Sequence, residues 1–329
     1  MDNVNDFFAT LSSCLWGWPM IILLLGTHIF LTIRLRFPQR KIITAIRLSV
    51  QRDKSQKGDV SQFGALATAL AATIGTGNII GVATAVALGG PGAVFWCWLT
   101  GVFGISTKYS EALLAIKYRV KSERGLMQGG PMYTLERGLG WRKMGILFAL
   151  FTAIAAFGIG CTVQANAIST IMHASYGIST EVSGGVLMLL AAAVIIGGVR
   201  SISKVCSMLV PFMALLYVVG CVYILFVNAS YVAPALKLIV GSAFSPEAAG
   251  GGFAGGSVIM AARYGIARGL FSNESGLGSA PIVAAAARTK NPVRQALVSS
   301  TGTFWDTVVI CALTGLVIVS SIIAYPDID

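Results

Sequence analysis

GALATALAATIGTGNIIGVATAVAL, residues 64–88, is an apolar stretch long enough to cross a lipid bilayer, because about 20 apolar residues span the hydrocarbon core. Its centre nevertheless holds four residues in a row that are poor material for a helix: Gly75, Thr76, Gly77 and Asn78. An unpaired backbone group in hydrocarbon costs several kcal/mol, so a membrane helix unwinds only where protein or water lines the break. Taken alone, the stretch leaves two interpretations open: a helix broken at a site, or a glycine-rich helix packed closely against its neighbours.

The composition places the whole chain in a membrane. Of its 329 residues, 55% are hydrophobic and only 11% are charged, and the mean hydropathy is +0.78. A soluble domain carries about 25% charged residues. We therefore predict an all-α polytopic membrane protein whose residues 1–329 form a single transmembrane domain. The candidate membrane helices are the apolar segments 14–33, 64–88, 92–116, 145–172, 183–199, 208–228, 254–287 and 296–324.

The charges fall on alternate joins between these segments. The net charge is +11, and 20 of the 24 Lys and Arg residues lie in four joins, at 34–58, 117–143, 200–204 and 288–294. The positive-inside rule makes these joins cytoplasmic, so we expect both ends of the chain outside the inner membrane of a bacterial cell. The first join mixes Ile, Leu and Val with basic residues, which favours an amphipathic helix along the inner surface over a solvated loop. The charges form no single face with stacking aromatics, so we expect no nucleic-acid partner.

A second segment is interrupted in the same manner. RYGIARGLFSNESGLGSAPIVAAAA, 263–287, contains LFSNESGLGS, where helix propensity fails while both flanks stay apolar. A pair of interrupted segments at corresponding positions is the best sequence indication of a binding site in a secondary transporter. If 64–88 is the first core helix, 254–287 is the sixth and runs the opposite way, as five plus five inverted helices require. We therefore predict an inverted-repeat fold with an extra N-terminal helix at 14–33, a first five-helix repeat at 64–228, and two helices of an incomplete second repeat at 254–324.

The two breaks offer complementary chemistry. The freed amides of Thr76 and Gly77 lie at the positive N-terminus of a half-helix, which suits a carboxylate. A hard cation such as Na⁺ prefers oxygen ligands. The candidate cation ligands are the carbonyls of Ala71, Thr73 and Ile74 and the side-chain oxygen of Asn78. In the second break, we expect Phe271 to cover a small apolar group and Ser272 or Asn273 to bind an ammonium, so the zwitterion of a small amino acid fits this set of groups.

Four blocks of the sequence resemble one known family. GGPGAVFWCWLTGVFG at 89–104, followed by KYSEALLAIKYR, is similar to the signature of the sodium:alanine symporters, the alanine/glycine:cation symporter family. ATIGTGNIIGVAT, QGGPMYTLERGLG and RGLFSNESGLGSAP resemble other recurring blocks of that family, and the resemblance runs along essentially the whole chain. Single residues depart from the pattern: Cys97 and Leu277 stand where Met is usual, and Ser275 where Ala is common.

The resemblance implies a leucine-transporter-type fold that moves alanine or glycine into the cell by alternating access, with Na⁺ as the coupling ion and no other cofactor. By motif position it implies that Thr76 and Gly77 hold the substrate carboxylate, that Gln164 in GCTVQANAIS reaches the substrate, and that Phe271 walls it in. It also supports Asn78 and the carbonyls around residues 71–74 as the cation site. Serine or another small solute as the passenger, and H⁺ as the coupling ion, stay open.

The chain stops early relative to the family that it resembles. Members normally carry three more core helices, whereas this chain ends at AYPDID, just after the seventh, so we interpret it as C-terminally truncated. One expectation is that a separate chain supplies the missing C-terminal helices. The alternative function is that of a truncated remnant, or one part of a split symporter, that does not transport alone.

Several polar residues inside the apolar segments have two interpretations each. Gln164 is expected to line the site, whereas Asn166 favours helix–helix hydrogen bonding. Asp306 lies within the membrane, where an acid is either functional or the buried partner of a basic residue. For Glu274 we favour capping of the second half-helix over a counter-charge for the cation, and for Arg263 and Arg268 an outer-vestibule ion pair over contact with the substrate. Lys108 and Glu111 are expected to form a snorkelling salt bridge.

Enzymatic chemistry has little support. His28 and His173 lie in different segments without companions, so neither a catalytic triad nor a metal site is predicted. The six cysteines fall inside apolar runs without metal-ligand spacing, and we expect them to pack as small hydrophobic side chains. We predict that the protein is not an enzyme.

Overall fold

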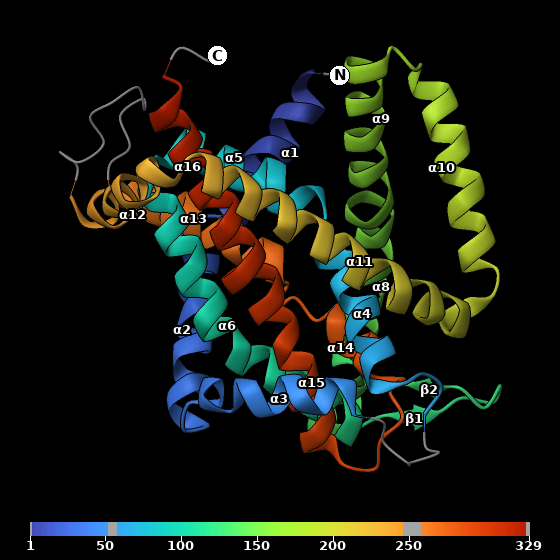
Figure 1. Cartoon of the computed structure of the whole chain (residues 1–329). Coiled ribbons are helices and arrows are strands. Elements are labelled where there is room, and N and C mark those ends of the chain that lie inside the picture. The colour runs from blue at the N-terminus through green and yellow to red at the C-terminus, as the bar shows by residue number, and fades with distance from the viewer. Residues whose placement is uncertain (1, 52–57, 246–257, 327–329) are drawn as a thin grey trace.

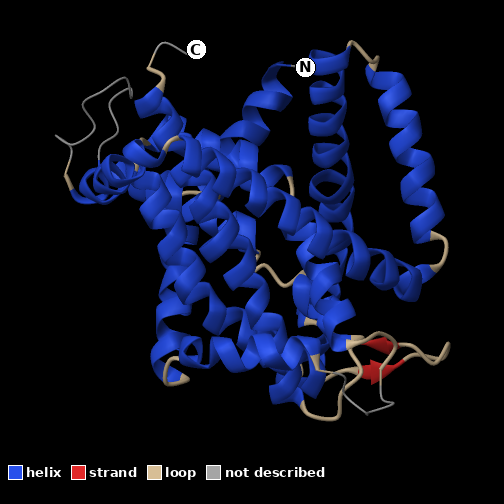
Figure 2. Cartoon of the chain, in the orientation of Figure 1, coloured by secondary structure: helices blue, strands red, loops and turns tan. Residues whose placement is uncertain are grey.

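The structure of the chain, a computed structural model, describes residues 2–51, 58–245 and 258–326 (Figure 1). Nearly all of these residues are helical (Figure 2). Within these ranges the strands are one short antiparallel pair, β1 (Val120–Lys121) and β2 (Met127–Gln128). The predicted all-α class is therefore confirmed.

The N-terminal region holds more helix than the sequence predicted. α2 (Trp18–Arg34) is the helix expected at 14–33, and α1 (Asp2–Leu15) precedes it across a turn. The chain then bends by 66° into a short 3-10 helix, η1 (Pro38–Lys41), and α3 (Ile42–Val50). The helix predicted in the basic join is thus present in its first part, while residues 52–57 lie outside the described residues.

The first predicted break is present and short. α4 (Gln62–Thr73) begins at Ser61, whose side chain accepts a hydrogen bond from the Gly64 amide at 2.9 Å. It is bent by 42° from α5 (Thr76–Gly89), and only Ile74 and Gly75 lie between the two helices. Thr76, Gly77 and Asn78 therefore form the first turn of α5, which agrees with the predicted half-helix N-terminus at Thr76 and Gly77.

The segments between the two breaks are helices with shifted ends. Their bounds are α6 Gly92–Lys117, α7 Pro131–Leu139, α8 Arg142–Ala155, η2 Ala156–Thr162, α9 Val163–Tyr176, α10 Thr180–Ile195, α11 Gly198–Val227 and α12 Ala229–Phe244. α8, the π-helical η2 and α9 join into one long helix where 145–172 was predicted. α11 begins before the predicted 208–228 and takes Arg200 and Lys204 into its first turns, and α12 was not predicted.

The second break separates α13 (Val258–Asn273) from the short α14 (Ala280–Ala285). Glu274, Gly276 and Gly278 have positive φ angles of 52°, 91° and 82°, so the backbone between the two helices is left-handed at three places. This confirms the predicted interruption of the segment 254–287. The first residues of that segment, 254–257, lie outside the described residues. The last helix consists of α15 (Pro292–Thr303), the π-helical η4 (Phe304–Cys311) and α16 (Ala312–Ala324), and it extends the predicted 296–324.

α6 is the central helix of the bundle. α2, α13, α14 and α15 pack against it, and α13 also packs against α5. The approach of α13 to α6 is close, because a β-carbon at Gly269 would lie 1.8 Å from Thr100 Oγ1. α9 and α10 stand to the side of this bundle (Figure 1), and most of their side chains are exposed. The packing therefore holds the two broken helices in contact with each other.

Three of the described helices are long and apolar enough to cross a membrane unaided: Arg142–Tyr176, Gly198–Val227 and Pro292–Ala324. Two bent pairs also qualify if each is one span, namely Trp18–Arg34 with Pro38–Val50, and Gln62–Thr73 with Thr76–Gly89. α6, α10 and α13 fall short of this measure, although spans were predicted at all three. The apolar helices nevertheless identify a multi-pass membrane protein.

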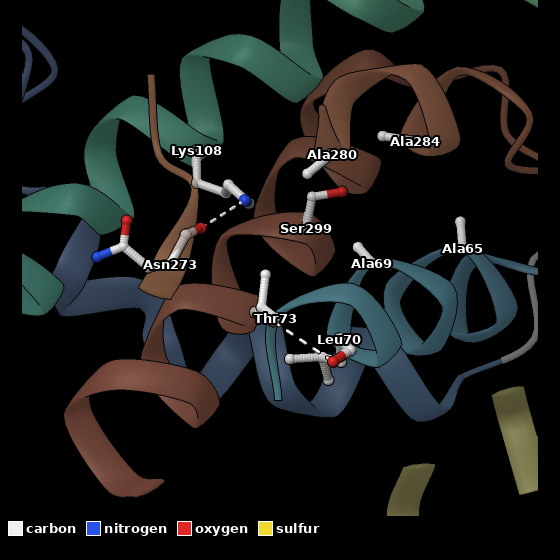
Figure 3. Close-up of a pocket in the computed structure, with 10 residues that line it drawn as sticks. Ala65, Ala69, Leu70, Thr73, Lys108, Asn273, Ala280, Ala284 and Ser299 are labelled. Atoms are coloured by element: carbon white, nitrogen blue, oxygen red, sulfur yellow. Dashed lines mark hydrogen bonds between the residues drawn. The ribbon is translucent and has the colours of Figure 1, made fainter. Parts of the chain in front are cut away.

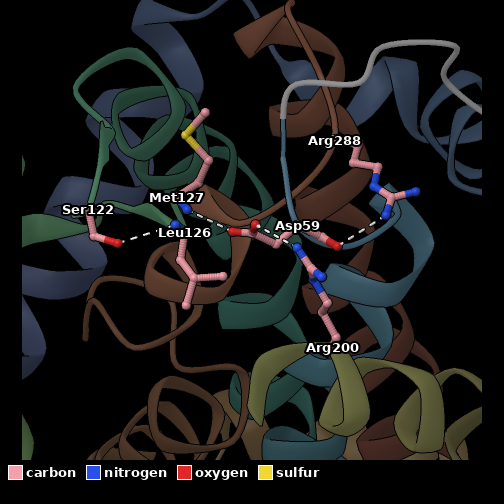
Figure 4. A network of polar contacts seen from close by, with 6 residues as sticks. All are labelled: Asp59, Ser122, Leu126, Met127, Arg200 and Arg288. Carbon is pink, nitrogen blue, oxygen red and sulfur yellow. Dashed lines mark hydrogen bonds and ion pairs between the residues drawn. The ribbon is translucent and has the colours of Figure 1, made fainter. Parts of the chain in front are cut away.

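The four basic joins meet at one end of the bundle, opposite the end that α1 and α16 reach (Figure 1). Asp59 is at the centre of these contacts (Figure 4). Its Oδ2 accepts a hydrogen bond from the Met127 amide at 2.7 Å, and its Oδ1 lies 3.9 Å from Arg200 Nη2. Arg288 Nη2 donates to the Asp59 carbonyl at 3.4 Å. Asp59, which lies just before the start of α4, therefore connects its own segment with three others.

Candidate functional site

Four of the six residues predicted to bind a substrate line one cavity of about 860 Å³. Thr76 and Gly77 belong to the first turn of α5, Gln164 to the first turn of α9, and Phe271 to the last turn of α13. Thr76 Oγ1 donates to Gln164 Oε1 at 2.7 Å, which links the first broken helix to α9. The first amides of a helix have no partner inside it and form its positive end, so an anion is favoured here.

An aromatic wall faces this polar end of α5. The rings of Phe271 and Trp16 stand edge to face with their centroids 5.8 Å apart, and Tyr264 lines the same cavity. Asn166 also lines it, and its Oδ1 lies 3.5 Å from Thr170 Oγ1 on the same helix. The helix–helix hydrogen bond expected of Asn166 is not seen among the described residues, and its position in the cavity fits the alternative interpretation, a residue that lines the site.

Asp306 joins the two breaks on the buried side of α5. Its side chain is fully buried, and Oδ1 accepts a hydrogen bond from Asn78 Nδ2 at 2.7 Å. Its Oδ2 accepts hydrogen bonds from Ser272 Oγ at 2.9 Å and Thr307 Oγ1 at 2.7 Å. Asn78 belongs to the first broken helix and Ser272 to the second, so a single carboxylate holds both.

No basic side chain lies within 4.0 Å of the Asp306 carboxylate among the described residues. The structure therefore does not support the interpretation of Asp306 as the partner of a basic residue. A buried carboxylate whose hydrogen-bond partners are all neutral has no direct ion-pair partner for its charge. Together with the Asn78 oxygen, it supplies the oxygen chemistry that a hard cation prefers.

Of the predicted cation ligands, Asn78 is the one whose side chain contacts Asp306 among the described residues. Asn78 Oδ1 accepts the Gly75 amide at 3.2 Å, next to Asp306, and Ile74 is buried in the break itself. Thr73 lines a separate small cavity of about 10 Å³, and the Ala71 side chain is exposed. The structure thus places Asn78 beside Asp306, and the carbonyls of Ala71, Thr73 and Ile74 stay predictions.

The small cavity lies between the ends of α4 and α13 and contains a buried lysine (Figure 3). Lys108 is 3% exposed, and its Nζ donates to the Asn273 carbonyl at 2.7 Å. The expected snorkelling salt bridge was wrong, because Lys108 points into the protein and lies beyond 4.0 Å from the Glu111 carboxylate. Its charge instead satisfies the negative C-terminal end of α13.

The residues after Phe271 point away from the larger cavity. Ser272 turns to Asp306 and Cys311, and Asn273 lines the small cavity, where its Oδ1 accepts the Ser275 amide at 2.9 Å. The structure therefore does not bring either side chain to the aromatic wall, where an ammonium was expected. Glu274 accepts a hydrogen bond from the Ser279 hydroxyl directly before α14, but no side-chain capping bond to the first amides of α14 is seen among the described residues, so the expected capping by Glu274 is not found.

Arg268 is the largest departure from expectation. The outer-vestibule ion pair predicted for it is absent within the described residues. The guanidinium instead lines the large cavity, donates to the Gly77 carbonyl, and lies over the Phe271 ring with its carbon 5.3 Å from the centroid. The missed signal was the pair of glycines four residues apart on α5, Gly77 and Gly81, which leaves the space that Arg268 occupies.

Within the described ranges, no group of three or more His, Cys, Asp or Glu side chains is arranged to hold a metal ion. Cys97, Cys221 and Cys311 are buried, in agreement with the expected packing role, whereas Cys14 and Cys161 are exposed. Cys311 also lies 3.4 Å from Asn78 Nδ2, at the edge of the Asp306 cluster.

Known proteins are similar to this chain along nearly its whole length. The model of the sodium:alanine symporter family matches residues 1–327. The chain is 52% identical to an uncharacterized transporter of Haemophilus influenzae over 96% of its own length and 70% of the relative. It is 51% identical to the sodium/alanine symporter AgcS of Methanococcus maripaludis over 100% and 73% of the two chains. It is 40% identical to YrbD of Bacillus subtilis, a putative sodium/proton-dependent alanine carrier, over 95% and 64%.

Proposed function

The chain belongs to the sodium:alanine symporter family, and from this premise we propose that it carries a small neutral amino acid, alanine or glycine, into the cell together with Na⁺. The passenger binds in the large cavity, and the ion binds at the cluster around Asp306. The two sites share α5, whose first turn offers Thr76 and Gly77 to one and Asn78 to the other. Binding of the ion therefore influences the geometry of the substrate site directly.

One observation carries this proposal: the break between α4 and α5 presents a positive helix end to a cavity and a carboxylate-bound asparagine to the protein interior. A zwitterion needs an anion site, an apolar wall and room for an ammonium. α5 supplies the first and Phe271 the second. The Gln164 and Asn166 side chains, which line the cavity, supply oxygens to the ammonium, a role first expected of Ser272 or Asn273.

The proposed cation site combines the Asp306 carboxylate, the Asn78 oxygen and the carbonyls of Thr73 and Ile74. All four lie near the break, and the buried negative charge of Asp306 favours cation binding over binding of a neutral molecule. Ala71 is the least supported of the predicted ligands, because it lies in the last turn of α4 with an exposed side chain. The name of the YrbD relative keeps H⁺ open as a second coupling ion.

Transport by alternating access in a leucine-transporter-type inverted repeat is part of the same proposal. It is supported by the two broken helices, which pack against each other, and by the Asp59 contacts, which tie together the end of the bundle away from the cavity. The concentration of basic joins at that end supports its assignment to the cytoplasm, with the α1 and α16 ends outside a bacterial inner membrane. No observation in the described residues favours a truncated remnant or a partner chain.

Uptake by the purified chain tests this function. The 329-residue protein is reconstituted into vesicles, and uptake of radiolabelled alanine and glycine is measured with an inward Na⁺ gradient and with K⁺ in its place. We expect accumulation only with Na⁺. Equal uptake in Na⁺ and K⁺ would contradict sodium coupling, and absence of uptake by folded protein that still binds alanine would support the non-transporting alternative.

A further inference from the structure

Arg268 places a positive charge inside the large cavity, opposite the first turn of α5. Its guanidinium lines the cavity together with Thr76, Gly77 and Phe271, and it packs over the Phe271 ring. A guanidinium has five N–H donors and cannot be deprotonated in a protein. The cavity therefore carries a permanent cation where the passenger is proposed to bind.

The surrounding chain is shaped to hold this side chain in place. A β-carbon at Gly81 would lie 1.7 Å from Arg268 Cζ, and one at Gly77 would lie 2.8 Å from Nη2. Both glycines face the same side of α5, because residues four apart lie one turn from each other on a helix. The notch formed by Gly77 and Gly81 thus accommodates the guanidinium. A side chain at either position would displace it.

The guanidinium nevertheless keeps unused donors. Nη2 donates to the Gly77 carbonyl, whereas the buried Nε has no hydrogen-bond partner among the described residues. Among the described residues, no carboxylate lies within 4.0 Å of the Arg268 guanidinium. The Asp306 carboxylate instead accepts hydrogen bonds from Asn78, Ser272 and Thr307. A buried cation without an anionic partner costs free energy, and a carboxylate from outside removes that cost.

We propose that Arg268 binds the carboxylate of the passenger and makes the site select amino acids over amines and amides of similar size. This inference rests on the proposed function. A carboxylate between Arg268 and the first turn of α5 is met from one side by a fork of N–H donors and from the other by the helix end and the Thr76 hydroxyl. Phe271, which packs under the guanidinium, keeps the fork turned toward the cavity.

The test compares alanine with alaninamide, which lacks the carboxylate charge. Both ligands compete against radiolabelled alanine on the purified chain at saturating Na⁺, in the wild type, Arg268→Gln and Arg268→Lys. We expect Arg268→Gln to lose alanine affinity on the order of 10- to 100-fold, because a charge-assisted bond is removed, while alaninamide affinity changes little. Arg268→Lys keeps the charge without the fork of donors, so its alanine affinity should lie between those of the wild type and Arg268→Gln.

Arg263→Gln is the matched control, since Arg263 lies on the same helix with its guanidinium over Tyr264, outside the residues that line the cavity. It should retain the wild-type preference for alanine. Gly81→Ala keeps Arg268 but fills its notch, so it should reproduce the loss if Arg268→Gln fails to fold. Wild-type selectivity in folded Arg268→Gln would overturn the inference alone, whereas a wild-type chain that binds neither alanine nor glycine would overturn the proposed function.

Discussion

Asn78 and Asp306 are 228 residues apart in the chain and joined by a hydrogen bond of 2.7 Å between Asn78 Nδ2 and Asp306 Oδ1. The same amide also lies 3.3 Å from the Asp306 carbonyl. Through this pair, the first turn of α5 is attached to the π-helical η4, where the backbone is wound more widely than in an α-helix. Ser272 attaches the second broken helix to the same carboxylate. A cation bound here therefore acts on both breaks at once.

Replacing Asn78 by alanine tests its share in cation binding. Because the variant removes one oxygen ligand and leaves the carboxylate, we expect the Na⁺ concentration for half-maximal alanine uptake to rise by about tenfold or more, with near-normal uptake at saturating Na⁺. Asn228→Ala is the control, since Asn228 is also a buried asparagine but bonds Ser321 far along the chain. An unchanged Na⁺ dependence in Asn78→Ala would remove this residue from the site.

Asp306→Asn keeps the shape of the side chain and removes its charge. A ligand that binds only the folded state stabilises it, so Na⁺ should raise the melting temperature of the wild type relative to K⁺. We expect this difference to vanish in Asp306→Asn, together with Na⁺-driven uptake. In K⁺ alone the variant should melt at the same or a higher temperature, because it no longer buries a charge without a direct ion-pair partner. A retained Na⁺-induced shift would show that the ion binds elsewhere.

Gly77→Val tests the closeness of approach at the first turn of α5. A β-carbon there lies 2.8 Å from Arg268 Nη2, so the branched side chain displaces the guanidinium and crowds the amides. We expect alanine affinity to fall by about tenfold or more, measured by equilibrium binding. Gly26→Val is the control, because no atom lies within 4 Å of a β-carbon at Gly26. Normal alanine binding to Gly77→Val would contradict the placement of the substrate beside α5.

Both breaks could be predicted from the sequence, because glycine and polar residues inside apolar flanks have no helical explanation at that depth. Thr76, Gly77, Gln164 and Phe271 could also be grouped, since motif position assigns each to a broken helix or to its neighbour. The bond that ends the first break could not be predicted. Asn78 Oδ1 accepts the Gly75 amide, and this local bond lets the helix restart two residues after it ends.

Long side chains were predicted less well than backbone. Arg268 and Lys108 were assigned by depth to the outer and inner surfaces, yet both turn inward. Their direction depends on contacts with other helices, which are the Gly77–Gly81 notch for Arg268 and the Asn273 carbonyl for Lys108. The spacing of the two glycines was visible in the sequence, but only the packing of α13 on α5 reveals what fills the space. The π-helical turns had no sequence signal that we recognised.

The contacts of Asp59 predict an order of stability at the basic end. Asp59 is 6% exposed and accepts the amide of the half-buried Met127, so Asp59→Ala leaves this N–H without its partner and should lower the free energy of unfolding by about 1–3 kcal/mol. The Arg200 side chain is 72% exposed and its Nη2 lies 3.9 Å from the carboxylate, so Arg200→Ala should cost less than about 1 kcal/mol.

Thermal unfolding of the two variants in the same detergent measures this difference. Asp59→Ala should melt at a clearly lower temperature than Arg200→Ala, and the latter should lie close to the wild type. Added salt should narrow the gap between Arg200→Ala and the wild type, because exposed charges are screened, and leave the effect of Asp59→Ala in place. Equal melting temperatures for the two variants would mean that the ion pair, and not the hydrogen bond to Met127, holds the basic joins together.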